Sequence, residues 1–227
     1  MVWSRLLAAT ADLAWGGSCC GCGRPGPVTC PSCVETIRAG VPRRVTGAPG
    51  QPPTWARGAY ADELRATILA CKERQGLGLV PLLAELCLGS AAAALNDTWP
   101  GGAVLLVPVP SSRRTVAERG FDLTGQLARR VARGLRPLGL EVSAGRLLRL
   151  SAGRDQVGLS ATDRTANRAH SMRVVPGPPG AVLVLDDIVT SGATLAEASR
   201  VLRANSREVL GAAVVAATPR RRPPHPP

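Results

Sequence analysis

The segment from Val182 to Thr194 constrains the fold more than any other part of the chain. It begins with four apolar residues, 182–185, half of them β-branched, and such a run is typical of a strand buried on both faces of a parallel sheet. Two carboxylates, Asp186 and Asp187, follow at its carboxyl end, and then come small or hydroxyl-bearing residues. Apolar residues next recur at helical spacing, at Leu195, Ala198, Val201 and Leu202. The order of strand, acid pair, compact loop and helix predicts an open α/β sheet with a ligand at the loop.

The loop after the acid pair has residue types suited to a phosphate group: Thr190, Ser191, Gly192, Ala193 and Thr194. Its backbone N–H groups can point at one anion, and the dipole of the following helix adds partial positive charge. The glycine permits a positive φ or a close approach of the ligand. A carboxylate beside a phosphate repels it unless the carboxylate binds something else, and both ribose hydroxyls and Mg²⁺ suit carboxylate oxygens. These preferences together describe a ribose 5-phosphate ligand.

Two simpler interpretations of the same residues stay open. Thr194 and Glu197 could form only a capping box at a helix N-terminus. The pair Asp186-Asp187 could be an acidic pocket of the receiver-domain kind. A strand, Asp, Gly-loop and helix pattern also arises by chance. The whole string, in its order, is more specific, and it resembles the PRPP-binding signature of type I phosphoribosyltransferases.

The charge of the chain favours an anionic partner. Its 227 residues carry a formal net charge of +12, which points to nucleic acid, a polyphosphate ligand or a membrane surface. Lys72 is the one lysine, and the abundant arginine, glycine and proline also fit a GC-rich coding bias. Charge alone therefore favours nucleic acid only modestly. Apolar residues make up 45% of the chain and aromatic residues 3%, so we expect a sizeable but aliphatic core.

The cysteines predict a metal site near the N-terminus. Five of the seven lie between positions 19 and 33, where Cys19-x-x-Cys22 is followed by Cys30-x-x-Cys33. Four thiolates form the tetrahedral shell that structural Zn²⁺ prefers, and no coordination position then stays open for catalysis. The seven residues between the pairs are fewer than in a usual zinc ribbon, so the module must be small. We expect Cys20 to be a bystander.

The alternative reading of the cysteines is a disulfide framework. The odd count and the lack of an export signal oppose it and favour a reducing cytoplasm. The segment from Met1 to Trp15 is interrupted by Asp12, which predicts an amphipathic helix rather than a signal peptide. No run of 18 apolar residues is present, so no membrane span is predicted. Cys71 and Cys87 lie in helix-like segments and are expected in the core.

The rest of the chain alternates between helix-like and strand-like segments. We expect helices over 62–75, 79–95 and 123–135, and strands over 103–107, 146–150, 182–185 and 209–217. This alternation predicts βαβ units and a mainly parallel sheet. A Pro- and Gly-rich stretch predicts a linker, and the Pro- and Arg-rich end predicts disorder. The expected units are an N-terminal helix with the zinc module, the linker, a main domain and a disordered basic tail, over 1–40, 41–54, 55–217 and 218–227.

Two further segments supply basic residues. Val107-Pro108-Val109-Pro110 ends a strand, because proline removes ladder donors, and arginines follow at the carboxyl end. There we predict a second phosphate site that comprises Val109, Pro110 and Arg113. Phe121, the only phenylalanine, is expected to pack rather than to stack on a base. The stretch 149–168 is polar and contains two glycines, as in a mobile lid, although a solvated basic face is the simpler alternative. The candidate diphosphate ligands are Arg119, Arg154, Arg164 and Arg168.

Five features follow one another along the chain: the cysteine pairs, a Tyr…Lys helix, VPVP…RGF, an R…Q…R..N segment and DDxxTSGxT. The combination, over about residues 19–215, resembles the ComF family of phosphoribosyltransferase-like proteins. The resemblance implies the type I phosphoribosyltransferase fold with an N-terminal zinc module and a link to DNA uptake in natural competence. It implies that Asp186 and Asp187 bind the ribose of PRPP and that the loop 190–194 binds its 5-phosphate.

Several positions qualify this resemblance. Asp122 replaces the asparagine that is common after RGF, and Ser191 replaces a common threonine. Lys72 matches a lysine of the family pattern, but no role can be assigned to it. Val109 to Arg113 falls where the diphosphate loop of the fold belongs. Mg²⁺ is expected together with the diphosphate.

Two functions are consistent with these expectations. The first is transfer of a 5-phosphoribosyl group from PRPP to an unknown acceptor, with catalysis by positioning and charge neutralisation. The second is a non-catalytic module that binds PRPP or a nucleotide and single-stranded DNA, together with a helicase or recombination partner. The net charge and the cysteine pairs favour the second, whereas the few aromatic residues weaken it. A PRPP-sensing regulator is a third reading.

Overall fold

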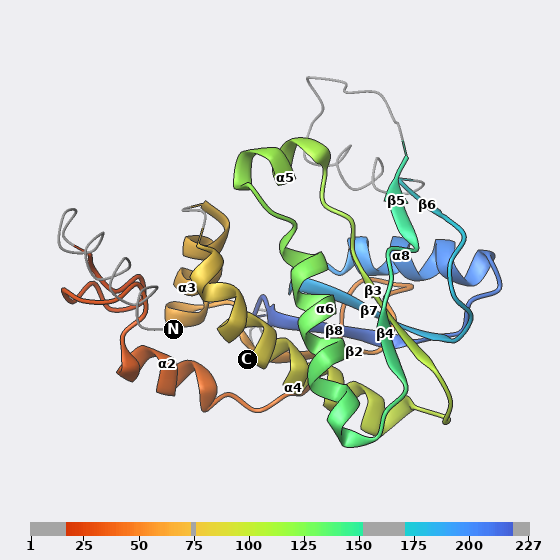
Figure 1. Cartoon of the computed structure of the whole chain (residues 1–227), viewed down its shortest axis with the longest axis horizontal. Helices are drawn as coiled ribbons and strands as arrows, with labels where there is room; N and C mark the ends of the chain where they lie inside the picture. The colour runs from red at the N-terminus through yellow and green to blue at the C-terminus, as the bar shows by residue number, and fades with distance from the viewer. Residues whose placement is uncertain (1–16, 74–75, 152–170, 220–227) are drawn as a thin grey trace, which may run out of the picture.

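A six-stranded sheet forms the centre of the computed structural model, which describes residues 17–73, 76–151 and 171–219 (Figure 1). The strand order is β1-β2-β8-β7-β3-β4, and every neighbouring pair is parallel except the edge pair of β1 and β2. The predicted fold class, a mainly parallel α/β sheet with a cysteine-rich N-terminal part, is confirmed. The strands are β1 (Arg43–Val45), β2 (Thr54–Ala59), β3 (Val104–Pro108), β4 (Val142–Ala144), β7 (Ala181–Val189) and β8 (Val209–Ala217).

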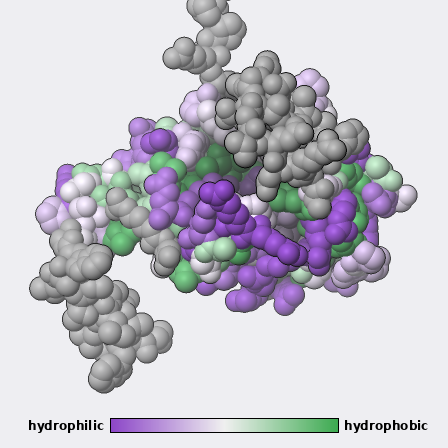
Figure 2. Space-filling view, turned by 90° about the horizontal axis from the view of Figure 1, so that it is seen from above, coloured by the Kyte–Doolittle hydropathy of each residue, from purple (hydrophilic) through white to green (hydrophobic). Residues whose placement is uncertain are grey.

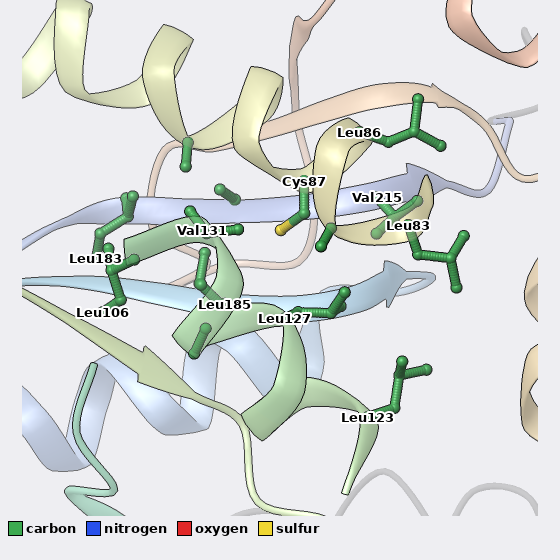
Figure 3. Close-up of a cluster of buried hydrophobic side chains, with 14 of the residues drawn as sticks. Leu83, Leu86, Cys87, Leu106, Leu123, Leu127, Val131, Leu183, Leu185 and Val215 are labelled. Carbon is green, nitrogen blue, oxygen red and sulfur yellow. The ribbon is translucent and has the colours of Figure 1, made fainter. Parts of the chain in front are cut away.

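Helices cover both faces of this sheet. Side chains of α3, α4 and α6 pack on one face, and those of α8 pack on the other. Figure 3 shows the first of these layers, where Leu127 and Val131 of α6 and Cys87 of α4 lie against Leu185 of β7. The helices are α2 (Pro31–Arg38), α3 (Asp62–Glu73), α4 (Val80–Thr98), α5 (Arg113–Arg119), α6 (Leu123–Leu135) and α8 (Ala193–Ala204), with 3₁₀ turns η1 (Leu77–Leu79) and η2 (Arg136–Leu138).

The alternation of side chains along β7 explains why two cores form. Leu183 and Leu185 point into the core under α4 and α6, whereas Val182 and Val184 point into the core under α8. All four residues are fully buried, as expected for a central parallel strand. Burial on both faces therefore fixes the register of β7 and, with it, the position of the acid pair along the strand.

Several boundaries differ from the sequence-based expectation. Strand β7 continues to Val189, so the acid pair lies within the strand and not beyond its end. Strand β3 includes Pro108, because that residue forms the last register pair with Leu185. The strand expected over 146–150 is reduced to β5 (Leu148–Leu150), which pairs antiparallel with β6 (Met172–Val174) in a separate two-stranded sheet. The final strand agrees with the expected range, 209–217.

The stretch expected to be a linker takes part in the sheet. Strand β1 lies within it and pairs antiparallel with β2. Pro53, which directly precedes β2, is already bonded to the sheet: its carbonyl accepts a hydrogen bond from Ala212 N of β8 at 2.7 Å. The residues between the cysteines and the main sheet are therefore packed against that sheet.

One helix among the described residues is long and apolar enough to cross a membrane. It comprises η1 and α4, over Leu77–Thr98, with a hydropathy of 1.8. Half of its most apolar window is buried inside the protein, where α4 packs on β2, β8 and α6. The central helix of an α/β core has the same length and composition, and this packing explains the apolar character of α4. On the side where α5 lies, hydrophilic side chains predominate over smaller apolar areas (Figure 2).

Candidate functional site

The acid pair lies on the central strand β7, at the level where the neighbouring parallel strand β3 ends. Asp186 and Asp187 come from β7, and the neighbouring β3 ends at the register partner of Leu185. The chain after β3 remains attached at this point, because Val109 N donates to the Leu185 carbonyl at 2.8 Å. The fold thus brings together the acid pair and the first residues of the predicted second phosphate site. In an open α/β sheet, this is the position at which ligands bind.

Lys72 is the site residue for which sequence analysis assigned no role. Its ammonium group, on α3, lies 2.7 Å from Asp187 Oδ2, and the two side chains are 23% and 10% exposed. The pair is therefore largely shielded from water, where its attraction is stronger than at an open surface. The family pattern singled out this lysine, but only the packing of α3 on the sheet shows its partner.

Asp186 has an unusual proton affinity. Its Oδ1 accepts a hydrogen bond from Asp187 N at 2.8 Å. Burial raises the pKa of the Asp186 carboxyl well above its usual value, and the Asp187 charge acts in the same direction, whereas the Asp187 N–H and Lys72 oppose the rise. A carboxyl group whose pKa is raised by burial and by a neighbouring charge, near the carboxyl ends of parallel strands, is a candidate functional group.

Asp186→Asn is expected to raise the melting temperature of the ligand-free protein at neutral pH. A raised pKa means that folding stability is present below the usual value of 3.8 and is lost as the pH rises toward the folded pKa. Asparagine does not titrate, and its side-chain oxygen can still accept the hydrogen bond from Asp187 N. Each unit by which the pKa rises corresponds to about 1.4 kcal/mol, or about 3–6 °C in the melting temperature of a chain of this size.

Melting curves of wild type and Asp186→Asn from about pH 4 to about pH 8 test this expectation. The difference in melting temperature should be small at the acidic end and should grow with pH. A variant that is less stable than wild type by the same amount at every pH would show that Asp186 is an ordinary ionised carboxylate.

The loop after β7 forms an uncapped helix N-terminus. Gly192, with φ of +85°, is the N-cap residue of α8, and no side chain caps this helix. The helix therefore begins at Ala193, so Ala193 and Thr194 belong to its first turn and not to the loop. The capping-box alternative is wrong, because Thr194 is not the N-cap and Glu197 instead pairs with Arg200 at 2.7 Å. Ala193 N donates only a long hydrogen bond, to Ser191 Oγ at 3.4 Å, and the other N–H groups of the first turn can be offered to an anion.

A segment before β2 packs on this loop, which the sequence did not indicate. Ala48 N donates to the Ser191 carbonyl at 2.9 Å. The Gln51 carboxamide lies so close to Gly192 that a Cβ there would collide with Gln51 Oε1. That oxygen is buried and accepts no hydrogen bond within the described chain. Gly192 is therefore required both by its positive φ and by the close approach of Gln51.

The remaining predicted anion ligands are only partly brought together. Val109 is buried, whereas Arg113 is exposed at the start of α5. Arg119, at the end of α5, lines the same cavity of about 440 Å³ as Lys72, between α3 and α5. Thus two cations, Lys72 and Arg119, lie on the α3 side of the acid pair. The other three predicted lid residues lie outside the described residues: Arg154, Arg164 and Arg168.

Three residues that were expected to pack do so. Phe121, Cys71 and Cys87 are all buried in the core under α4 and α6. Burial raises the pKa of Cys71 to about 11 and that of Cys87 to about 12, so both thiols stay protonated at neutral pH. Asp122, the departure from the family pattern, is the N-cap of α6, where its carboxylate accepts from Gly125 N at 3.1 Å and pairs with Arg146 at 2.7 Å.

Four cysteine sulfurs gather at the N-terminal module, as the spacing predicted. The sulfurs of Cys19, Cys22, Cys30 and Cys33 all lie within 4.8 Å of one another. The Cys19–Cys33 and Cys22–Cys30 sulfur pairs are each 3.7 Å apart. A zinc ion with Zn–S bonds of about 2.3 Å in a regular tetrahedron requires sulfurs about 3.8 Å apart. The donor set and its dimensions therefore fit a structural zinc ion.

The surroundings of the sulfurs also suit a metal better than a disulfide. All seven cysteines are free, and 3.7 Å is far longer than a disulfide bond of about 2.05 Å. Burial opposes ionisation of Cys19, but the backbone N–H groups around its sulfur outweigh this and lower its pKa to about 6. Burial, together with the neighbouring sulfurs, raises the pKa of Cys33. Cys20 lies outside the cluster and contacts Thr67 instead, as expected of a bystander.

Comparisons with known proteins found a likeness only among solved structures. No family model matches the chain, and no curated protein matches it. Among solved structures, the chain is similar to the crystal structure of orotate phosphoribosyltransferase from Aeropyrum pernix. The match has 14% sequence identity and a TM-score of 0.34, and it covers 82% of this chain and 92% of that chain.

Proposed function

We propose that the protein binds PRPP, or a related ribose phosphate, at the carboxyl ends of β3 and β7. The observation that carries the proposal is the acid pair on β7, followed within a few residues by the uncapped N-terminus of α8. This arrangement offers carboxylates to ribose hydroxyls and main-chain N–H groups to a phosphate, both near the carboxyl end of β7. The sequence string DDIVTSGAT supplies both halves in the order of the type I phosphoribosyltransferase signature.

In this proposal each group has a separate task. Asp186 and Asp187 accept hydrogen bonds from the ribose hydroxyls, and the N–H groups of 191–194 bind the 5-phosphate. Val109, Pro110 and Arg113 bind the diphosphate, and Arg119 and Lys72 add positive charge beside it. Mg²⁺, when bound with the ligand, neutralises diphosphate charge through its oxygen ligands. Arg154, Arg164 and Arg168 are the proposed lid residues.

If the protein is catalytic, the reaction is transfer of the 5-phosphoribosyl group. The bond from ribose C1 to diphosphate breaks, and its electron pair leaves with the diphosphate. A lone pair of the acceptor then bonds to C1, and the acceptor loses a proton. Positive charge develops at C1 between these events, and the Asp186 and Asp187 carboxylates lie on the ribose side where they stabilise it.

A second candidate is an accessory protein that binds PRPP or a nucleotide and single-stranded DNA, with a helicase or recombination partner. The net charge of +12 and the cysteine module favour it. Stacking platforms are scarce, since Trp55 and Phe121 are buried and only Trp99 is well exposed among the described tryptophans and phenylalanine. A ComF-type role in competence and a cytoplasmic location belong to the same proposal and rest on the sequence motifs.

Diphosphate release from PRPP and Mg²⁺, measured with a panel of bases, tests the catalytic form of the proposal. Release that depends on one acceptor and on Asp187 establishes a transferase. Tight PRPP binding without release, combined with single-strand binding that has a steep salt dependence, establishes the accessory protein. A protein that neither binds PRPP nor releases diphosphate from it would refute both candidate functions.

Lys72→Met is expected to weaken PRPP binding about tenfold at neutral pH, with partial recovery at higher pH. Lys72 lowers the pKa of Asp186, so its loss raises that pKa further and favours the uncharged carboxyl, which is a weaker hydrogen-bond acceptor for ribose hydroxyls. Calorimetric titration with PRPP and Mg²⁺ across pH measures the effect, and Lys72→Arg should retain most of the affinity. A Lys72→Met variant with the wild-type pH profile would contradict this role.

A further inference from the structure

A second cavity lies on the opposite side of β7 from β3. It has a volume of about 500 Å³ and is bounded by β1, the carboxyl-terminal part of β2, and the last residues of β7 and β8. Its walls include the chain that leaves the cysteine module, at Gly40 and Val41. Pockets for small organic ligands have volumes of about 300–1,000 Å³, so this cavity is of sufficient size.

The charge of this cavity is entirely of one sign. Arg43, Arg44 and Arg57 line it, and no aspartate or glutamate does. Within the described part of the chain, these three arginines form no ion pair. Arg43 and Arg44 are exposed on the short edge strand β1, where no packing requirement calls for two adjacent arginines. The cavity therefore has unneutralised positive charge.

The arginines are partly held in place before any ligand binds. The Arg44 guanidinium lies 5.7 Å from the centre of the Trp55 ring, a cation–π distance. Arg57 donates from Nη2 to the Arg38 carbonyl at 2.6 Å, while its Nε is buried without an acceptor. A buried N–H donor without an acceptor is rare in proteins. Preordered guanidinium groups lose less entropy when they bind an oxyanion.

The other walls of the cavity indicate the kind of anion. Hydroxyl groups come from Thr46, Thr190 and Thr218, and the remaining lining is mostly apolar, from valine, alanine and glycine. Several guanidinium groups match a dianion better than a single carboxylate, and apolar walls suit the organic part of the ligand. The geometry points to a second ligand site here, for a small phosphomonoester with an apolar or planar body.

This site does not depend on the proposed PRPP function. Thr190, the first residue of the predicted phosphate loop, lines the cavity, but neither Asp186 nor Asp187 does. The two sites therefore open on either side of the end of β7, and apart from Thr190 each can be altered without replacing residues of the other. A ligand in the arginine-lined cavity would contact the start of the phosphate loop through Thr190.

Calorimetric titration of the full chain with phenyl phosphate tests the inference. Arg43→Gln/Arg44→Gln should weaken binding about tenfold or more, because two charged contacts are lost. The control, Arg129→Gln/Arg130→Gln, removes the same charge from exposed positions of α6 and should leave the affinity within about twofold. Benzoate, a monoanion with the same ring, should bind more weakly than phenyl phosphate.

Four results would overturn the inference: equal weakening in both double variants, equal binding of benzoate, no binding of phenyl phosphate by wild type, or binding of oligothymidylate alone. The PRPP-dependent melting shift of Arg43→Gln/Arg44→Gln separates this test from the proposed function. A retained shift with weakened phenyl phosphate binding supports two sites. Weakened phenyl phosphate binding in a protein that never responds to PRPP supports the cavity and refutes the proposed function.

Discussion

Cys19→Ser or Cys33→Ser is expected to abolish stoichiometric zinc binding and to unfold the N-terminal module. Both side chains are buried at the centre of the four-sulfur cluster, and hydroxyl groups are poor zinc ligands. Binding of zinc to such peptides stabilises the folded form by about 10–16 kcal/mol at neutral pH, so its loss exceeds what a module of this size can compensate. Metal analysis of untagged protein should give one zinc per wild-type chain and far less in either variant.

Cys20→Ser is the matched control for this experiment. Cys20 lies beside the cluster in sequence but contacts Thr29 and Thr67 through its sulfur, at 3.5 and 3.7 Å. Its replacement should therefore keep the zinc and change stability little. A wild-type protein without zinc, or a Cys19→Ser variant that keeps a full equivalent, would contradict the assignment. Loss of zinc in Cys20→Ser would show that the ligand set is wrong.

Asp186→Asn/Asp187→Asn is expected to abolish the stabilisation of the protein by PRPP and Mg²⁺ while leaving the fold intact. At a ligand concentration about 100 times Kd, binding stabilises the folded state by about 2.7 kcal/mol, or about 5–10 °C for a chain of this size. The variant removes both carboxylates that would bind the ribose but keeps the shape of the side chains. Thermal melting with and without the ligand measures the shift directly.

Glu141→Gln/Glu208→Gln provides the control for the acid pair. These two exposed carboxylates precede β4 and β8, at the amino ends of these strands, whereas the acid pair lies toward the carboxyl end of β7, and the substitution removes the same net charge. The control should keep the full PRPP shift. An unchanged shift in the acid-pair variant would count against the site, and a loss in both variants would show that overall charge, not the site, determines binding.

The parts of the fold that could be predicted are those set by local patterns. The cluster of four cysteines follows from two Cys-x-x-Cys pairs, and β8 follows from a continuous apolar run. Strand β7 was expected to end at Leu185, because two carboxylates seldom continue a strand. It continues because pairing with β8 extends to Val189 and Lys72 neutralises Asp187. Tertiary contacts therefore outweighed local propensity at the acid pair of the proposed site.

Contacts distant in sequence could not be predicted. Lys72 reaches Asp187 only because α3 packs on the sheet beside α4. Gln51 reaches Gly192 because the stretch expected to be a linker packs on the sheet through β1. The short edge strand β1 has an alternation too brief to distinguish from a loop. Both contacts bring polar groups to the proposed ligand site, so its surroundings depend on packing more than on the signature motif.

A structure of the protein with PRPP and Mg²⁺ tests the central claim most directly. The account predicts the ribose hydroxyls within hydrogen-bond distance of Asp186 and Asp187, and the 5-phosphate at the N–H groups of 191–194. PRPP bound only in the arginine-lined cavity beside β1, or a phosphate loop that stays covered by Gln51 with no ligand at saturating concentration, would contradict it.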